Sequence, residues 1–229
     1  MKIKGIAFDL EGPLVDVESA HHQGHILSAA DVGLKMTNED CLKLPHFIGG
    51  PDTEVAKEIA QLAGGAADAD FVYNRKKFHY DELIKTLPIR LRPGVTNIFE
   101  EIMEENLKIA VGSLTIKAQA TLLLEKTGLY GIFGKNILLR EDVRNVKPDP
   151  EVFLKTAEIM GIRPEEQLVF EDSPNGIIAA KAAGSIAVGM PTIHVPITIK
   201  KLIDAGAVRI FWDWREINFQ SLIKNLNQI

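Results

Sequence analysis

Three short apolar runs of the sequence each end in side chains that could take part in chemistry. Asp9 follows the first run, Ser113 the second, and Glu171 with Asp172 the third. A loop before a predicted helix could bring the ammonium group of Lys147 to the same place. Because ligands of an open parallel sheet bind beyond the carboxyl ends of its strands, neighbouring strands would gather these groups in one crevice.

Such a set of groups is suited to phosphoryl transfer. A carboxylate can attack phosphorus and hold an acyl phosphate, which divides one difficult step into two easier ones. A divalent cation and a lysine neutralise the charge on the transferring oxygens. Carboxylate and carbonyl oxygens are the ligands that Mg²⁺ prefers, so the acidic residues predict a magnesium cofactor. A serine hydroxyl and backbone N–H groups at a helix start can bind the remaining phosphate oxygens.

The apolar runs have the composition of strands that are buried on both faces of a parallel sheet. Helices separate them, each with a proline or a polar residue near its start, and the last three are followed by a glycine. The strands are expected at 4–8, 107–112, 167–170 and 185–189, and the helices at 93–106, 117–126, 150–160 and 173–183. This alternation predicts an α/β fold, a Rossmann-like parallel sheet with helices on both faces.

Residues 16–88 have a different pattern, without any strand. Helical periodicity extends over 17–62, with breaks expected at Gly33, Pro45 and Gly49-Gly50, and a further helix is expected at 69–86. The sequence therefore predicts a helical cap domain at 16–88, inserted after the first strand of a core domain formed by 1–15 and 89–229. The polar junctions near 14–17 and 86–92 are expected to act as hinges, and the cap as a lid.

Bulk composition excludes several classes of protein. The 229 residues carry a net charge of −5 without a basic tract, so neither nucleic acid nor a membrane surface is an expected partner. No apolar stretch approaches the roughly 20 residues of a spanning helix. The first residues enter a strand without the apolar segment of a leader, which predicts a cytoplasmic protein. The single cysteine, Cys41, is expected to be a buried apolar residue.

The order and spacing of these residues resemble the four motifs of the haloacid dehalogenase superfamily, over nearly the whole chain. The resemblance rests on 9–12 after a strand, Ser113 after a second strand, Lys147 before Pro-Asp-Pro, and the run 171–176. An insertion after the first motif is similar to the subgroup of β-phosphoglucomutase and small phosphoglycolate or sugar-phosphate phosphatases. Four ordered motifs are far more specific than any one of them alone.

The resemblance implies a role for each matched residue. Asp9 would be the nucleophile and a magnesium ligand, with the backbone carbonyl of Glu11 as a second ligand. Asp172, helped by Glu171, would complete the protein side of the metal site. The phosphoryl group would be held by Ser113 and Lys147, and Thr115 could assist Ser113 or replace it; His21 would lie where the insertion meets the site and touch the substrate.

Position 11 departs from the family, which usually has aspartate there as general acid and base. Glu11 keeps the carboxyl chemistry, but its extra methylene displaces the carboxyl by roughly 1.5 Å. A misplacement of about 1 Å can lower a rate by on the order of a hundredfold. Retained metal binding with slow or specialised hydrolysis is therefore expected, and Glu11→Asp should not turn over more slowly than the parent.

Each residue also has a structural interpretation. Glu171 and Asp172 could be acids favoured by a helix dipole, and Lys147 could be a solvated loop lysine. His21 and His25 share a helical face, but without a third ligand at a sensible spacing we interpret the histidines as surface or cleft-edge residues. The aromatic segment 211–214 is interpreted as a late strand and packing.

Five functions compete. The leading hypothesis is a magnesium-dependent phosphatase of a small phosphorylated metabolite, and the second is a β-phosphoglucomutase-like phosphomutase. A mutase needs a cap cation, whereas the segment 51–54 is acidic. A metal-free dehalogenase would not need these acids, and a phosphonate hydrolase needs a cap lysine that neither Lys43 nor Lys57 matches in pattern. A binding or regulatory protein without turnover stays open, as do substrate identity and oligomeric state.

Overall fold

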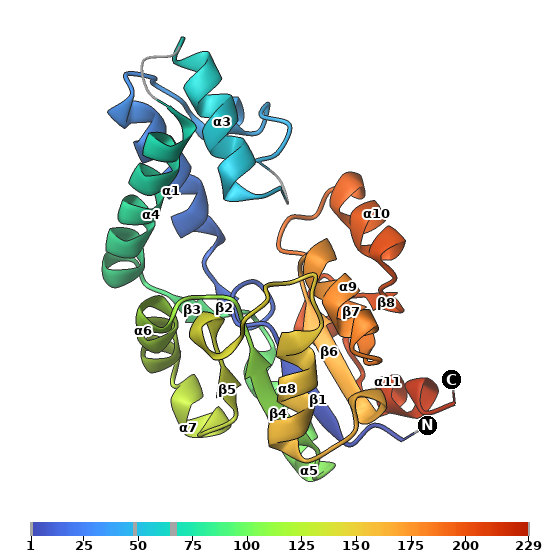
Figure 1. Cartoon of the computed structure of the whole chain (residues 1–229). Coiled ribbons are helices and arrows are strands. Elements are labelled where there is room, and N and C mark those ends of the chain that lie inside the picture. The colour runs from blue at the N-terminus through green and yellow to red at the C-terminus, as the bar shows by residue number, and fades with distance from the viewer. Residues whose placement is uncertain (1, 48–49, 65–67, 229) are drawn as a thin grey trace. The chain divides into compact units, whose positions relative to one another are not determined.

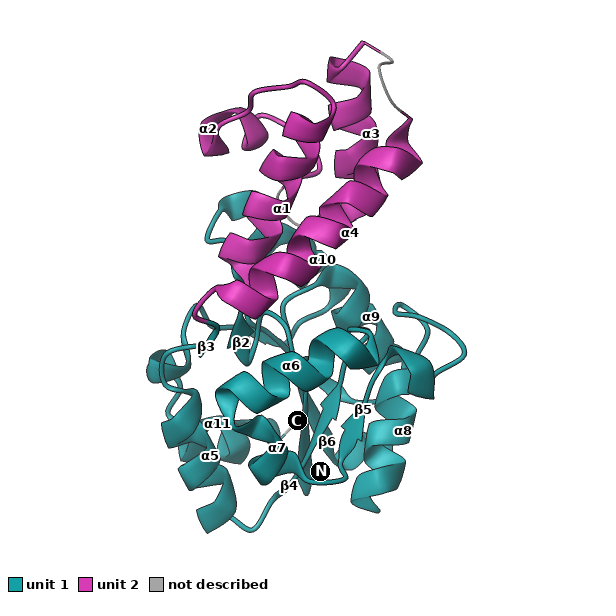
Figure 2. Cartoon of the chain, turned by 90° about the vertical axis from the view of Figure 1, so that its left-hand side faces the viewer, with its two compact units in different colours: residues 1–16, 89–229 teal, residues 17–88 magenta. Residues whose placement is uncertain are grey.

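The structure of the chain, a computed structural model, describes residues 2–47, 50–64 and 68–228. It divides into two compact units, which Figure 2 colours separately. Unit 1 consists of Met1–Asp16 and Ile89–Ile229, and unit 2 of Val17–Pro88. Asp16 therefore belongs to unit 1 and not to the predicted insertion.

Unit 1 is built on a parallel sheet of six strands in the order β5-β4-β1-β6-β7-β8 (Figure 1). The strands are β1 (Gly5–Phe8), β4 (Lys108–Gly112), β5 (Ile137–Leu138), β6 (Gln167–Glu171), β7 (Ile186–Gly189) and β8 (Arg209–Ile210). The four predicted runs form the four central strands, and the predicted α/β class is confirmed. The two outer strands, of two residues each, were not predicted, because so short a strand has no periodicity.

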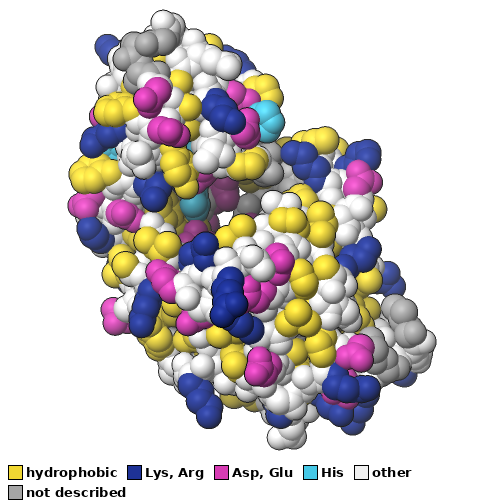
Figure 3. Space-filling view, in the orientation of Figure 1, with side chains coloured by type: hydrophobic (Ala, Val, Ile, Leu, Met, Phe, Trp, Pro, Cys, Tyr) yellow, Lys and Arg dark blue, Asp and Glu magenta, His cyan; other side chains and the backbone are white. Residues whose placement is uncertain are grey.

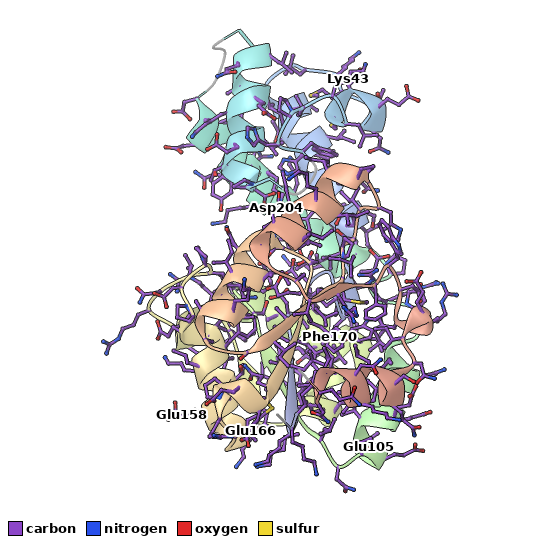
Figure 4. The ribbon with its side chains drawn as sticks, turned by 90° about the vertical axis from the view of Figure 1, so that its right-hand side faces the viewer. Lys43, Glu105, Glu158, Glu166, Phe170 and Asp204 are labelled. Atoms are coloured by element: carbon purple, nitrogen blue, oxygen red, sulfur yellow. The ribbon has the colours of Figure 1, made fainter. Side chains whose placement is uncertain are left out.

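Small and aromatic side chains lie on opposite faces of this sheet. Ala7, Ala110 and Val169 of adjacent strands contribute to a buried cluster with α8, α9 and α10. On the other face, the ring of Phe8 stacks on that of Phe170 with centroids 5.7 Å apart. Figure 4 shows Phe170 among tightly packed side chains inside unit 1. The helices thus approach closely over alanines on one face, while aromatic rings fill the larger space on the other.

The helices of unit 1 are α5 (Val95–Glu104), α6 (Lys117–Thr127), α7 (Leu129–Phe133), η1 (Arg140–Asp142), α8 (Glu151–Met160), η2 (Pro164–Glu166), α9 (Pro174–Ala182), α10 (Pro196–Ala205), η3 (Trp214–Glu216) and α11 (Phe219–Leu226). The four predicted helices of this unit correspond to α5, α6, α8 and α9 and begin and end near the predicted residues, whereas the other helices were not predicted. Gly128 ends α6 in a left-handed conformation, with φ +74°, as predicted. The aromatic segment 211–214 follows β8 instead of forming a strand, so only its predicted packing role is confirmed, with Trp214 buried.

Unit 2 is helical and has a core of its own. Its helices are α1 (Glu18–Asp31), α2 (Asn38–Cys41), α3 (Asp52–Leu62) and α4 (Ala69–Thr86), the last with the predicted bounds. Cys41 is fully buried there, as expected. The predicted breaks at Gly33, Pro45 and Gly50 lie outside these helices, whereas Gly49 is outside the described residues.

Two strand segments flank the insertion in sequence. β2 (Val15–Asp16) pairs antiparallel with β3 (Arg90–Leu91), so that Val15 lies opposite Leu91. The two segments predicted as polar hinges therefore contain a pair of hydrogen-bonded strands. The sequence did not predict these strands, because hydrogen bonding between them defines them.

Charged side chains of both signs are interspersed with hydrophobic ones on the face of each unit drawn in Figure 3. Among the described residues, no helix combines the length and apolar character needed to cross a membrane.

Candidate active site

The predicted site residues lie at the carboxyl edge of the sheet. β1 lies between β4 and β6, and the backbone N–H of Asp9 donates to the carbonyl of Phe170 at 3.0 Å. Asp9 and Glu171 therefore sit at corresponding ends of neighbouring strands, and Ser113 follows the end of β4 on the other side. The structure brings these three residues together as the motif spacing predicted.

Lys147 joins two of the predicted carboxylates. Its ammonium group donates to Asp9 Oδ1 and to Glu171 Oε1, each at 2.6 Å, and to the carbonyl of Gly112 at 3.1 Å. The Lys147 side chain is only 6% exposed, so the interpretation as a solvated loop lysine is wrong. The three acceptors match the three donors of an ammonium group, which is therefore held in one position.

Burial and charge act in opposite directions on this pair. Burial is the largest influence on Asp9 and raises the pKa of its carboxyl, while the ammonium of Lys147 opposes this shift. Burial alone would lower the pKa of Lys147, but attraction to Asp9 and Glu171 raises it above the ordinary lysine value. Lys147 is thus kept charged beside the carboxylate that would attack phosphorus.

Both oxygens of Glu171 are engaged within the site. Oε2 accepts from the backbone N–H and from the hydroxyl of Ser173, both at 2.9 Å, while Oε1 accepts from Lys147. Ser173 also caps α9 by accepting from the N–H of Gly176. A Cβ at Gly176 would lie 1.9 Å from the carboxyl carbon of Glu171, so only glycine leaves room for this carboxylate. These contacts make Glu171 a support for Lys147 and for the start of α9.

Asp172 lies against the turn that follows Asp9. A Cβ built on Gly12 would be 2.3 Å from Asp172 Oδ2, and Gly12 has φ +91°. Glycine is therefore required at position 12 for two reasons: the backbone has a positive φ there, and the Asp172 carboxylate leaves no room for a Cβ. The predicted metal-ligand loops, at Asp9–Glu11 and at Asp172, are thus in direct contact.

Glu11 reaches toward the end of β4. The hydroxyl of Thr115 donates to Glu11 Oε1 at 2.7 Å. Because the Thr115 hydroxyl donates its proton to Glu11, it accepts from the Ser113 hydroxyl, 3.0 Å away. Thr115, predicted as a helper of Ser113, therefore also contacts the predicted acid and base, and the three side chains form one hydrogen-bonded series.

The predicted substrate residue His21 lies in unit 2, where it belongs to a polar cluster. Its Nδ1 is 2.8 Å from the ammonium of Lys76, and its ring stacks on Tyr80 at 4.3 Å. Lys76 is only 2% exposed and forms an ion pair with Asp52, which also accepts from Nε2 of His25 at 3.0 Å. His25 is buried, so interpreting all the histidines as surface or cleft-edge residues was wrong.

Sequence reasoning missed Lys76 and Asp52, because their partners lie on other helices and charged residues usually indicate a solvated face. It also missed Arg92 and Trp214, which bind main-chain carbonyls next to the site. Arg92 could have been noticed in the sequence, because it stands between a predicted return to the sheet and a Pro-Gly turn.

Among the described residues, no three His, Cys, Asp or Glu side chains form a cluster that could hold a metal ion.

Comparison with known proteins supports one family over most of the chain. The family model of haloacid dehalogenase-like hydrolases matches residues 3–184. Protein CbbY of Rhodobacter capsulatus is 30% identical over 198 residues, covering 84% of this chain and 87% of its own length. A phosphorylated carbohydrates phosphatase of Thermotoga maritima is 29% identical over 211 residues, covering 91% and 94%.

A solved structure agrees with this assignment at the level of the fold. A conserved haloacid dehalogenase-like protein from Agrobacterium tumefaciens has a TM-score of 0.83 at 23% identity, and the match covers 98% of this chain and 99% of that one. The match spans both units, each with its predicted type of secondary structure. The chain therefore belongs to the haloacid dehalogenase-like hydrolases, and it is a hydrolytic enzyme of the family that its four motifs predicted.

Proposed function

We propose that this hydrolase is a magnesium-dependent phosphatase that acts on a small phosphorylated sugar through a phosphorylated Asp9. The observation that carries the proposal is the buried contact of Asp9 with the ammonium of Lys147 at the carboxyl end of β1. A carboxylate fixed beside a permanent positive charge can attack phosphorus while the charge on the phosphoryl oxygens is neutralised.

The residues at this edge of the sheet supply the remaining roles. Asp9 Oδ forms the bond to phosphorus as the bond to the alcohol oxygen breaks, and Glu11 gives that oxygen its proton. Glu11 then takes a proton from water as the water oxygen attacks the acyl phosphate, which releases phosphate and restores Asp9. The positive charge of Lys147 would stabilise the phosphoryl oxygens in both steps, and the Ser113 hydroxyl would turn from Thr115 to bind one of them.

The donor set fits a magnesium ion. Asp9 and Asp172 offer carboxylate oxygens, and the backbone carbonyl of Glu11 is a third hard donor of the kind that Mg²⁺ binds. We assign Glu171 a supporting role instead of direct ligation, because Lys147 and Ser173 already occupy its two oxygens. A bound magnesium ion would supply positive charge to the phosphoryl oxygens at the carboxyl edge of the sheet.

The sugar class and the role of unit 2 are further parts of the proposal. A relative that shares 29% identity over 91% of this chain is named for phosphorylated carbohydrates, and its name indicates which substrates to screen. We propose that the helical unit selects the alcohol group, as caps do in the family that the motifs resemble. The mutase and the turnover-deficient alternatives are separated from hydrolysis by measuring release of inorganic phosphate.

The test is hydrolysis of p-nitrophenyl phosphate, and then of a panel of sugar phosphates, with and without magnesium. Asp9→Asn should abolish activity, and Asp172→Asn should raise the magnesium concentration at half-saturation by about tenfold or more, the effect of losing one metal contact. Asp204→Asn is the matched control, because Asp204 is an exposed acid paired with Lys200 on α10. Full activity in Asp9→Asn, or activity that is indifferent to magnesium, would overturn the proposal.

A further inference from the structure

The Arg92 side chain binds main-chain carbonyls from three separate loops of unit 1. Arg92 directly follows β3, and its backbone N–H donates to the carbonyl of Leu14 at 2.8 Å. Its guanidinium donates to four carbonyls, those of Gly12 (3.2 Å), Met190 (3.1 Å), Pro191 (3.5 Å) and Trp212 (2.5 Å). A planar guanidinium with five donors can satisfy such a set, whereas an ammonium group is a compact point charge on a flexible stem.

Trp214 holds the same turn from another direction. Its indole Nε1 donates to the carbonyl of Pro13 at 2.7 Å, and the residue is 1% exposed. The indole ring packs on Phe170, with centroids 4.6 Å apart. Three successive carbonyls, those of residues 12–14, therefore accept from Arg92 or Trp214. The turn that carries Glu11 is thus fixed by residues about 80 and 200 positions further along the chain.

The same guanidinium also connects to the other acidic loop. The backbone N–H of Met190 donates to the carbonyl of Glu171 at 2.7 Å, while its own carbonyl accepts from Arg92. Arg92 is therefore hydrogen-bonded to the turn after β1 and, through Met190, to the end of β6, where Asp172 follows. These are the two loops that hold the proposed acid and base and the proposed metal ligands.

We infer that Arg92 and Trp214 are positioning residues, which set the separation of the Glu11 turn from the Glu171-Asp172 loop. They act through main-chain carbonyls and have no role as proton donors or metal ligands. The consequence for catalysis rests on the proposed function, because a displacement of about 1 Å at Glu11 matters only if that side chain transfers protons.

The kinetic test compares Arg92→Lys and Trp214→Phe with the parent. Arg92→Lys keeps the charge but removes the planar fork, and Trp214→Phe keeps an aromatic ring but removes the indole donor. Each should lower kcat by about tenfold or more, with KM within about threefold and with the same folded fraction at the assay temperature. Arg215→Lys is the control, because its side chain is 68% exposed and pairs with Asp213.

A second readout does not depend on turnover. The N–H of Gly12 donates to the carbonyl of Val15, and the N–H of Val15 donates to that of Leu10, each at 3.0 Å. Hydrogen exchange of these two amides should accelerate in Arg92→Lys and in Trp214→Phe, but not in Arg215→Lys.

Unchanged exchange of the turn, or a kcat loss that follows the folded fraction or equals that of the control, would overturn the inference. An inactive parent whose turn still loosens in the two variants would refute the proposed function and leave the positioning role supported.

Discussion

The contact between Thr115 and Glu11 gives a quantitative prediction about the departure at position 11. Thr115→Val removes the hydroxyl that lies 2.7 Å from Glu11 Oε1 and preserves the shape of the side chain. A hydrogen bond to a charged group contributes about 1.5–3 kcal/mol, and the lower figure applies because both side chains are half-buried. If this bond holds Glu11 in its working position, kcat should fall about tenfold, since 1.4 kcal/mol corresponds to a factor of ten.

A double-mutant cycle isolates this contact. In the Glu11→Asp background the carboxyl is about 1.5 Å shorter in reach, so it no longer meets Thr115. There, Thr115→Val should change kcat by less than about twofold, and Glu11→Asp alone should turn over at least as fast as the parent. The coupling energy of the cycle should therefore be about 1–1.4 kcal/mol.

The assay is steady-state hydrolysis at saturating magnesium, with unfolding midpoints measured for all four proteins. Thr121→Val is the control, because Thr121 makes a comparable hydroxyl contact with Tyr130 at 3.1 Å on the exposed side of α6. An equal loss of kcat in both backgrounds, or no loss with Glu11 present, would refute the reasoning that Thr115 positions Glu11.

Two further substitutions test the packing around the site and the buried cluster of unit 2. Gly176→Ala should destabilise the protein by about 1–3 kcal/mol and lower kcat at least tenfold, because its Cβ would displace the Glu171 carboxylate. Gly131→Ala, where a Cβ meets no atom within 4 Å, should be neutral in thermal unfolding and in activity. Burial lowers the pKa of His25 below 6.5, so the unfolded chain binds its proton more readily and stability should decrease as pH falls through about 6.5. His25→Gln should flatten this dependence in urea unfolding at pH 7.5 and 5.5, whereas an unchanged slope, or an equal effect of His194→Gln, would contradict it.

Much of the carboxyl edge could be predicted from the sequence, for a physical reason. Strands buried on both faces must be apolar, so a polar residue at the end of such a run is conspicuous. Asp9, Ser113 and Glu171 were found in this way, and the spacing of the motifs added Lys147. The structure brings Lys147 within hydrogen-bonding distance of Asp9 and of Glu171.

Two kinds of contact could not be predicted from the sequence: those made with main-chain carbonyls, and those between side chains that only the packing of helices brings together. The Arg92 guanidinium binds carbonyls, which every residue possesses, so no pattern marks its partners. Lys76 is a charged residue in a helix, a pattern typical of a solvated face, and only the packing of α1, α3 and α4 buries it beside Asp52 and His21. Short outer strands such as β5 are defined by pairing alone.

The charge balance at the carboxyl edge links the structure to the proposed cofactor. Asp9, Glu11, Glu171 and Asp172 bring four carboxyl groups to adjacent strand ends, and the one ammonium group of Lys147 donates to Asp9 and Glu171. Besides burial, repulsion from Glu171 and Glu11 raises the pKa of Asp9, and a dianionic phosphate ester would add to this repulsion. A divalent cation bound by Asp9 and Asp172 would offset that excess, whereas Lys147 alone cannot. In the proposed mechanism, the acids that would repel a phosphate ester without metal would instead hold the magnesium ion that binds it.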